Sequence, residues 1–173
     1  VINNFLSKKF LVKRVGFNRK QIIVWSVQRV RGLNNTINMW IKDVYPKNKN
    51  IKLYIFGIDK KIFKFNKKLN KKFNIYFFGR VSKEKLQKIY NKSLAMICLG
   101  YDETFCLNAL EANASGLPIL TFGKSALKDY SINNYNSYIL NDFKELSNKI
   151  IFISKKKNNN KIILNSFKKS KQY

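Results

Sequence analysis

The chain alternates short, continuous runs of apolar residues with longer amphipathic stretches. Runs without polar interruption are typical of strands that are buried on both faces, as in the parallel sheets of α/β proteins. The runs expected to form strands are 22–27, 52–57, 74–79, 94–100, 119–122 and 138–140. The pattern predicts an α/β fold with a Rossmann-like parallel sheet of about six strands and helices on both faces. Ligands of such sheets bind beyond the carboxyl ends of the strands, so we expect a site in the loops after Val27, Gly57, Gly79 and Gly100.

The amphipathic stretches predict helices that return the chain from one strand to the next. Apolar residues recur at helical spacing over 33–44. Ser82 is a suitable N-cap for the helix after the third run, and Gly116 is suited to end the helix expected at 104–115. The other segments expected to be helical, at least in part, are 62–73, 125–130 and 142–153.

Length and composition exclude several classes of protein. A chain of 173 residues with 45% hydrophobic residues is long and apolar enough for one core, so it is not intrinsically disordered. No apolar run reaches the roughly 18–20 residues that cross a bilayer. With two cysteines, a disulfide scaffold is not expected, and the lack of histidine excludes histidine-based metal ligation and Ser-His catalysis.

The net charge of +26 first suggests a polyanionic partner. Only five of the 35 cations are arginines, however, and the lysines are spread along the whole chain. A bias towards Lys, Asn and Ile is what drift in an AT-rich genome produces, so we expect no specific nucleic-acid partner. A basic nucleic-acid-binding domain stays open as an alternative that rests on charge alone, and the lysines could also hold the protein against an anionic membrane surface.

The chain divides by composition into three parts. Residues 1–20 are expected to be a hinge or linker entering the domain, 21–154 the domain itself, and 155–173 a tail rich in Lys and Asn. The first residues carry their positive charges after the apolar ones, opposite to a secretory signal. We therefore expect a cytoplasmic protein, either free or peripheral on the inner face of the membrane.

The segment 101–120 contains the residues best placed for binding. Glu103 precedes a predicted helix and Glu111 lies within it, about 12 Å further along at ~1.5 Å per residue. That spacing matches a nucleoside diphosphate sugar. The first-turn N–H groups of Phe105, Cys106 and Leu107 would face its diphosphate, with the glutamates on sugar and ribose hydroxyls. The alternative is that Glu103 caps the helix and Glu111 is a solvated helical residue.

Three motifs of the chain carry a resemblance to a known family. ETFCLNALEANASGLPIL, residues 103–120, resembles the E-x7-E signature of retaining nucleotide-sugar glycosyltransferases of the GT-B fold, family four type. SVQRVRGL, residues 26–33, resembles the family's phosphate-binding turn, and NIYFFGRVS, residues 74–82, resembles its third strand and base-side loop. The match covers about 22–140 and implies one half of a GT-B fold, the half that binds the donor.

The resemblance also implies roles for the residues of the phosphate-binding turn. Arg31, before Gly32, stands where the family places a basic residue against the distal phosphate, and a guanidinium fork suits that task. Ser26 is near another phosphate-side position that is often Arg, and Arg29 could act in its stead. The alternative for Arg31 is an exposed loop charge.

Roles for the other segments follow in the same way. Arg80 and Val81 stand where the family's loop packs against the nucleobase. Thr104 to Leu107 would support the departing diphosphate together with Arg31, while Glu103 orients the sugar, so Arg31 and Glu103 are the expected catalytic residues. Cys106 occupies a position often held by Gly, which favours a space-filling role over a nucleophilic one. Cys98, in the fourth apolar run, is expected in the core.

The activity implied is transfer of a glycosyl group, of hexosyl type, from a nucleoside diphosphate sugar to an acceptor with retention of configuration. Family members of this kind act on polysaccharides, lipid-linked sugars or other glycoconjugates, for example in bacterial polysaccharide synthesis. We expect no metal and no cofactor beyond the donor substrate. An N-terminal GT-B half is expected in cis or in trans, and the alternative function is a catalytically silent nucleotide-sugar-binding fragment that lacks it.

Overall fold

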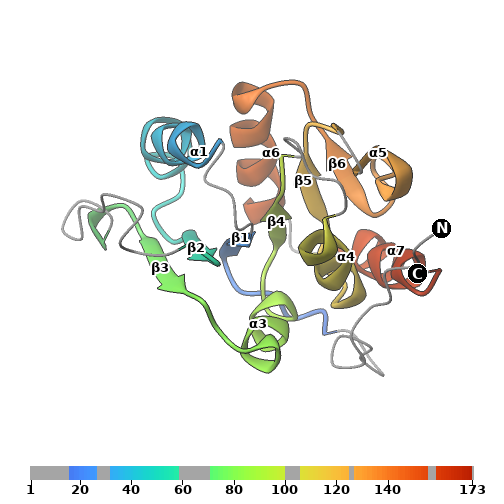
Figure 1. Cartoon of the computed structure of the whole chain (residues 1–173). Helices are drawn as coiled ribbons and strands as arrows, with labels where there is room; N and C mark the ends of the chain where they lie inside the picture. The colour runs from blue at the N-terminus through green and yellow to red at the C-terminus, as the bar shows by residue number, and fades with distance from the viewer. Residues whose placement is uncertain are drawn as a thin grey trace.

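Six parallel strands form a single sheet in the order β3-β2-β1-β4-β5-β6 (Figure 1). The computed structural model describes residues 16–26, 32–58, 71–99, 106–124, 127–155 and 159–172. The strands are β1 (Ile22–Ser26), β2 (Lys52–Phe56), β3 (Ile75–Gly79), β4 (Ala95–Ile97), β5 (Ile119–Thr121) and β6 (Ser137–Ile139). The α/β fold with a six-stranded, Rossmann-like parallel sheet that the apolar runs predict is confirmed.

β1 is the central strand of the sheet. Its residue Ile23 pairs with Leu53 of β2 on one side and with Ala95 of β4 on the other. All five residues of β1 are buried, and so are most residues of β2, β4 and β5. Because both faces of these strands are covered by helices, their side chains need no alternation between apolar and polar.

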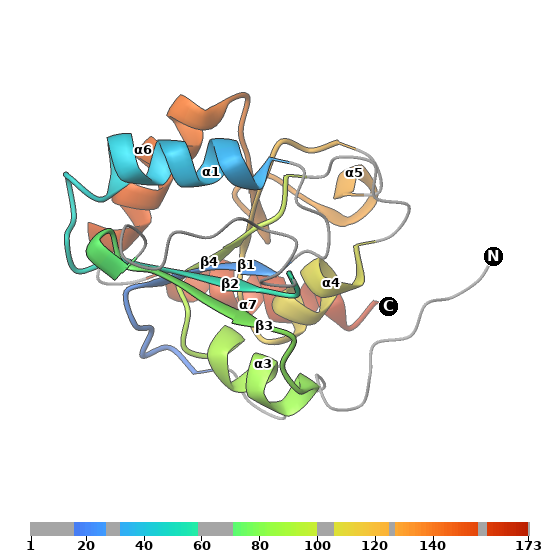
Figure 2. The same cartoon turned by 60° about the vertical axis from the view of Figure 1, so that its left-hand side comes forward.

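Helices cover both faces of the sheet. They are α1 (Leu33–Met39), its π-helical continuation η2 (Trp40–Val44), α3 (Lys83–Tyr90), α4 (Leu107–Ala114), α5 (Leu127–Tyr130), α6 (Phe143–Lys155) and α7 (Asn160–Ser170). Figure 2 shows α1 and α6 on one side of the sheet and α3 on the other. α6 contacts α1 and η2, whereas α4 contacts α3 and α7. The indole of Trp40, fully buried, donates a hydrogen bond to the carbonyl of Phe73 at 3.0 Å.

Most expected elements are confirmed with small shifts at their ends. The Ser82 side chain caps α3 by accepting from the N–H of Lys85, and Gly116 adopts φ 68° after α4. The last helix of the expected domain begins one residue late because the Asp142 carboxylate accepts from the N–H of Glu145 and caps it. Residues 59–70, which include most of the expected lysine-rich helix, lie outside the described part of the chain.

The expectation of a tail at 155–173 is wrong for residues 160–170, which form α7. α7 packs on α4 and buries Ile162 and Ile163. The Ser166 hydroxyl also donates to the carbonyls of Ile162 and Asn136, at 2.8 and 3.2 Å. The sequence interpretation missed α7 because lysines fill its exposed face and small serines take up part of the buried one. A serine that can bond to the carbonyl four residues earlier is compatible with helix burial.

Arg19 ties the segment before β1 to the ends of two helices. Its guanidinium donates to the carbonyls of Tyr90 and Ser93, at 2.7 and 3.4 Å, and to those of Ser115 and Gly116, both at 3.2 Å. Burial lowers the pKa of Arg19 to about 10. Of the expected linker at 1–20, residues 1–15 lie outside the described part. Within the described residues, no helix combines the length and the apolar character needed to cross a membrane.

Candidate functional site

The strand order identifies the carboxyl ends of β1 and β4 as the place where sheets of this kind bind ligands, and we call this place the crevice. From β1 the chain continues to β2 and β3 on one side, whereas β4 begins the other side of the sheet. At such a reversal the two adjoining loops turn in opposite directions and leave a crevice for a ligand. Ser26 ends β1 there, Gly32 precedes α1, and Cys106 precedes α4. Two of the four strands after which the sequence predicts a site, β1 and β4, are therefore neighbours at this point of the sheet.

Gly32 forms the turn that leads into α1. It adopts φ 82° and ψ −9°, a left-handed conformation that disfavours residues with a Cβ. Its carbonyl accepts hydrogen bonds from the N–H and from the hydroxyl of Thr36, both at 2.9 Å. Gly32 is thus bonded to the first turn of the helix as its N-cap. The sequence expectation of a tight turn at Gly32 agrees with this conformation.

The start of α4 differs from the expected one. Cys106 has φ −86° and ψ 76°, which is not helical, and it forms the N-cap. The N–H groups of Ala109 and Leu110 both donate to the Cys106 carbonyl, at 2.9 and 3.3 Å. The helix therefore begins at Leu107, and its first amides are those of Leu107 and Asn108; of the expected amides, that of Phe105 lies outside the described part of the chain. A helix start carries a partial positive charge and favours anions.

Asn108 links the start of α4 to the end of β1. Its side-chain amide donates to the carbonyl of Ser26 at 2.5 Å. Ser26 itself is buried, with 3% of its surface exposed. This bond holds two walls of the crevice together, and it was absent from the sequence interpretation.

Glu111 is buried within α4, with 4% of the residue exposed. The alternative interpretation of a solvated helical glutamate is therefore wrong. One carboxylate oxygen, Oε1, accepts a hydrogen bond from the ammonium group of Lys83, the first residue of α3, and the two groups form an ion pair. The other, Oε2, is buried and has no hydrogen-bond partner among the described residues. Burial raises the pKa of Glu111 above its ordinary value, and the contact with Lys83 offsets part of that increase.

Cys106 and Cys98 form a buried pair beneath the crevice. Their Sγ atoms lie 3.1 Å apart and neither is in a disulfide. Cys106 is 3% exposed, and its carbonyl accepts a hydrogen bond from the hydroxyl of Tyr130 at 3.1 Å. The prediction that Cys98 lies in the core is confirmed, and the burial of Cys106 agrees with a space-filling role.

Arg80 and Val81 follow β3, on the far side of β2 from β1. Arg80 is exposed and Val81 is half-buried. They stand just before α3. Its first residue, Lys83, contacts Glu111, so the segment that follows β3 is linked to α4 through this ion pair. The predicted contact of this loop with a nucleobase stays a prediction.

The described residues bring together part of the predicted site. Ser26, Gly32, Cys106, Leu107 and Glu111 lie on the elements that border the crevice. The predicted residues that lie outside the described part are Arg29, Arg31, Glu103, Thr104 and Phe105.

Sequence reasoning did not identify Lys83 or Asn108. Lys83 is one of 30 lysines in the chain, and only the packing of α3 on α4 distinguishes it. Asn108 stands one helical turn before Glu111 in the motif, but nothing in the motif indicates that its amide reaches Ser26.

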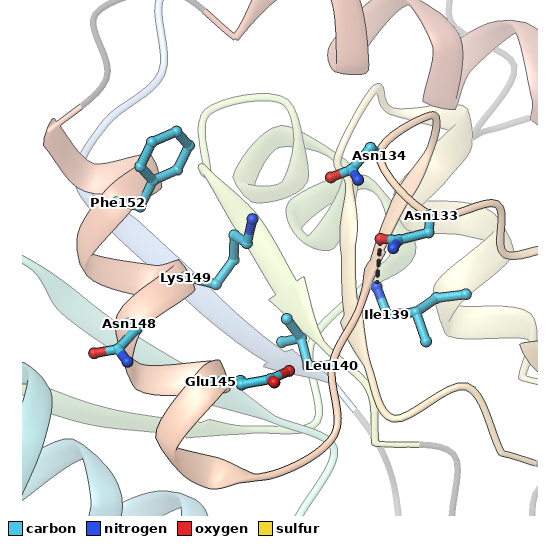
Figure 3. A pocket seen from close by; sticks show the side chains of 8 residues that line it. All are labelled: Asn133, Asn134, Ile139, Leu140, Glu145, Asn148, Lys149 and Phe152. Atoms are coloured by element: carbon cyan, nitrogen blue, oxygen red, sulfur yellow. Dashed lines mark hydrogen bonds between the residues drawn. The ribbon is translucent and has the colours of Figure 1, made fainter.

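A separate pocket of about 410 Å³ lies beside the edge strand β6 (Figure 3). Two of its polar side chains already have hydrogen-bond partners: Asn133 accepts from the N–H of Ile139 at 3.1 Å, and the Glu145 carboxylate accepts from Asn141. The ammonium of Lys149 lies 4.6 Å from the ring centre of Tyr138. β5 separates β6 from β4, so this pocket is distinct from the crevice, and its composition does not indicate a ligand.

Solved structures that resemble this chain include glycosyltransferases. The pneumococcal O-GlcNAc transferase GtfA, solved with UDP and GlcNAc, matches at TM-score 0.70 and 14% identity over 92% of this chain. Anabaena HepE, solved with UDP and glucose, matches at TM-score 0.70 and 12% identity over 89% of this chain and 44% of its own. At this level of identity the likeness establishes the fold alone.

The extent of these matches corresponds to one domain. The chain spans 35% of the GtfA chain. It covers 92% of the C-terminal domain of the group 1 glycosyltransferase LpcC from Francisella tularensis, at TM-score 0.70 and 19% identity over 98% of this chain. A search of curated proteins found no match.

The profile of one protein family matches nearly the whole chain. Its description is "Glycosyl transferases group 1", and it aligns with residues 7–169. The sequence motifs and the strand order agree with that match. The chain therefore belongs to the group 1 family of glycosyltransferases.

Proposed function

We propose that this chain is the donor-binding half of a retaining, metal-independent glycosyltransferase that uses a nucleoside diphosphate sugar. The observation that carries the proposal is Glu111, a buried carboxylate beside the crevice with one oxygen that has no hydrogen-bond partner among the described residues. Burying a charged group without full hydrogen bonding costs free energy, so such a residue needs a reason to be kept. Ribose hydroxyls are donors that would satisfy it.

The diphosphate is assigned to the two turns that border the crevice. Gly32 is left-handed at the start of α1, and the start of α4 presents the amides of Leu107 and Asn108. Both features favour an anion. Arg31 precedes Gly32 and supplies the guanidinium for the distal phosphate, with Arg29 and Ser26 on the same side. Arg80 and Val81 pack against the base, and Glu103 orients the sugar.

In the reaction, the bond between the anomeric carbon and the diphosphate oxygen breaks, a bond forms from that carbon to the oxygen of an acceptor hydroxyl, and the hydroxyl proton passes to the departing diphosphate. Arg31 and the segment Thr104 to Leu107 stabilise the negative charge that develops on the diphosphate, which is an electrostatic contribution. The acceptor is a polysaccharide, a lipid-linked sugar or another glycoconjugate. Since the chain corresponds to about a third of GtfA, we assign acceptor binding to an N-terminal half in the same or a separate polypeptide. We assign the activity to the cytoplasm, where the lysines of the chain could contact anionic lipid.

Calorimetric titration with UDP, ADP and GDP tests the binding function. At least one should bind the full chain, and Glu111→Ala should weaken binding by about tenfold or more, since it removes hydrogen bonds to a charged group. Glu145→Ala is the matched control, because Glu145 is an exposed helical glutamate on α6, away from the crevice. No binding to any of the three, or equal binding by wild type and Glu111→Ala, would reject the proposal.

Transfer itself is tested by adding an N-terminal GT-B half to the chain in trans, together with a donor sugar. Nuclear magnetic resonance of the product identifies the anomeric configuration, which should equal that of the donor. An inverted product would contradict the retaining mechanism and leave the binding function intact.

A further inference from the structure

The contact between Lys83 and Glu111 joins two elements that no motif of the chain connects. Lys83 is the first residue of α3, and its side chain is 48% exposed, whereas the Glu111 side chain is 5% exposed. The ammonium contacts Oε1 only, and Oε2 has no hydrogen-bond partner among the described residues. The carboxylate is thus held at one oxygen, while the other is buried and lacks a hydrogen-bond partner among the described residues.

The position of Lys83 along the chain is also informative. It follows the loop of Arg80 and Val81 directly, after the N-cap Ser82. That loop is assigned to the base, and Glu111 is assigned to the ribose. A base and its ribose are neighbours in any nucleotide, so one side chain that starts beside the base-side loop and ends on the ribose carboxylate fixes the spacing of the two contacts.

We propose that Lys83 is a positioning residue for the donor nucleotide, which holds the Glu111 carboxylate charged and oriented so that Oε2 accepts hydrogen bonds from the ribose. This inference rests on the proposed function of Glu111. Lys83 acts through Glu111 and does not itself need to touch the ligand.

The charge balance around Glu111 supports this role. Among the described residues, Lys83 and Tyr90, both on α3, are the ionisable groups whose interactions with Glu111 are resolved. Burial raises the pKa of Tyr90 well above its ordinary value, so the phenol is neutral wherever Glu111 titrates. Lys83 is then the group that opposes the effect of burial on Glu111. Without it, the carboxyl would take up a proton more readily and lose an acceptor site.

The test compares nucleotides with and without ribose hydroxyls. UDP, ADP and GDP and their 2′,3′-dideoxy analogues are titrated into the wild type and into Lys83→Met, Lys83→Arg and Lys85→Met. Lys83→Met should weaken the nucleotide that binds wild type by about tenfold to a hundredfold, and its dideoxy analogue little. Lys83→Arg should restore most of the affinity. Lys85→Met, an exposed lysine two residues along the same helix, should change nothing.

Two further readouts separate positioning from a merely structural role. The loss in Lys83→Met should deepen as the pH is lowered from about 8 to about 6, because the Glu111 carboxyl then protonates more readily. In a Glu111→Gln background, Lys83→Met should have no further effect on nucleotide affinity, which a double-mutant cycle measures.

The outcomes are distinguishable. If wild type binds a nucleotide but Lys83→Met binds it equally well, or loses the nucleotide and its dideoxy analogue to the same extent, this inference is overturned and the proposed function stands. If wild type binds none of the nucleotides, the proposed function fails and this inference fails with it.

Discussion

The side-chain amide of Asn108 donates a hydrogen bond to the carbonyl of Ser26, with 2.5 Å between nitrogen and oxygen. The bond joins the start of α4 to the end of the central strand, across the crevice that the strand order creates. It fixes the start of α4 against the end of β1. A diphosphate bound at the start of α4 needs that position to be constant.

Replacing Asn108 by Ala should therefore impair binding more than folding. The carbonyl of Ser26 loses its donor, which should lower the free energy of unfolding by about 1–2 kcal/mol. Affinity for the nucleoside diphosphate should fall several-fold, measured by calorimetry beside urea denaturation. Asn148→Ala, at an exposed position of α6, is the control and should leave both quantities unchanged. A loss of stability without a loss of affinity would show that the bond does not set the geometry of the crevice.

Gly32→Ala tests the left-handed turn before α1. At φ 82° an added Cβ costs about 1–2 kcal/mol, so the midpoint of urea unfolding should fall accordingly. Gly16→Ala is a matched control, because there an added Cβ would meet the Asn91 carbonyl oxygen at an ordinary 3.7 Å. Equal effects of the two substitutions would contradict a special conformation at Gly32. The nucleotide affinity of Gly32→Ala should fall as well if the turn holds phosphate.

The packing of α7 on α4 is tested by a pair of neighbouring residues. Ile163 is 2% exposed, and Ile163→Ala should lower the free energy of unfolding by about 2–5 kcal/mol through the cavity it creates. Leu164, next along the helix, is 39% exposed, and Leu164→Ala should change it by about 0.5 kcal/mol or less. Chemical denaturation measures both. Similar small losses would mean that residues 160–170 are a tail after all.

The raised pKa of Glu111 has a stability consequence with a definite sign. The folded carboxyl binds its proton more tightly than the unfolded one, so the contribution of Glu111 to stability is greatest below the unfolded pKa. It is lost as the pH rises through the higher, folded pKa. The stability of wild type relative to Glu111→Gln should therefore decrease with rising pH in this window and then level off, as urea denaturation across a pH series would show.

Glu145 supplies the control of opposite sign. Hydrogen bonds from Asn141 lower its pKa, so its contribution is present above the unfolded pKa and is lost as the pH falls through the folded value. Wild type relative to Glu145→Gln should gain stability as the pH rises. If both glutamates gave the same trend, the burial of Glu111 would not be what determines its titration.

The sheet could be predicted from the sequence because its strands are buried on both faces. The run at 22–27 contains β1 and ends within one residue of it, since a continuous apolar run there has no other stable environment. The short strand β6 was expected one residue late, because Leu140 is apolar but lies beyond the last ladder pair, Thr121 with Ile139. α7 was missed because its lysines conceal the spacing of its buried residues.

The candidate site was predictable only in part, for a related reason. Glu111 and Gly32 stand in local motifs, so their placement follows from segments a few residues long. The contacts of Lys83 with Glu111 and of Asn108 with Ser26 join residues 28 and 82 positions apart. Such pairs depend on how helices pack in three dimensions, and no periodicity within one segment reports that.

The hydrogen bonds from Arg19 to the ends of α3 and α4 have a practical consequence for any shortened version of the chain. A version that starts at Gln21 would keep every strand of the sheet, yet the carbonyl groups at the ends of α3 and α4 would lose their common donor. Lys83 is the first residue of α3, and Glu111 lies in the middle of α4. Removing residues 16–20 would thus weaken the packing of α3 and α4, the two helices that carry the Lys83–Glu111 ion pair.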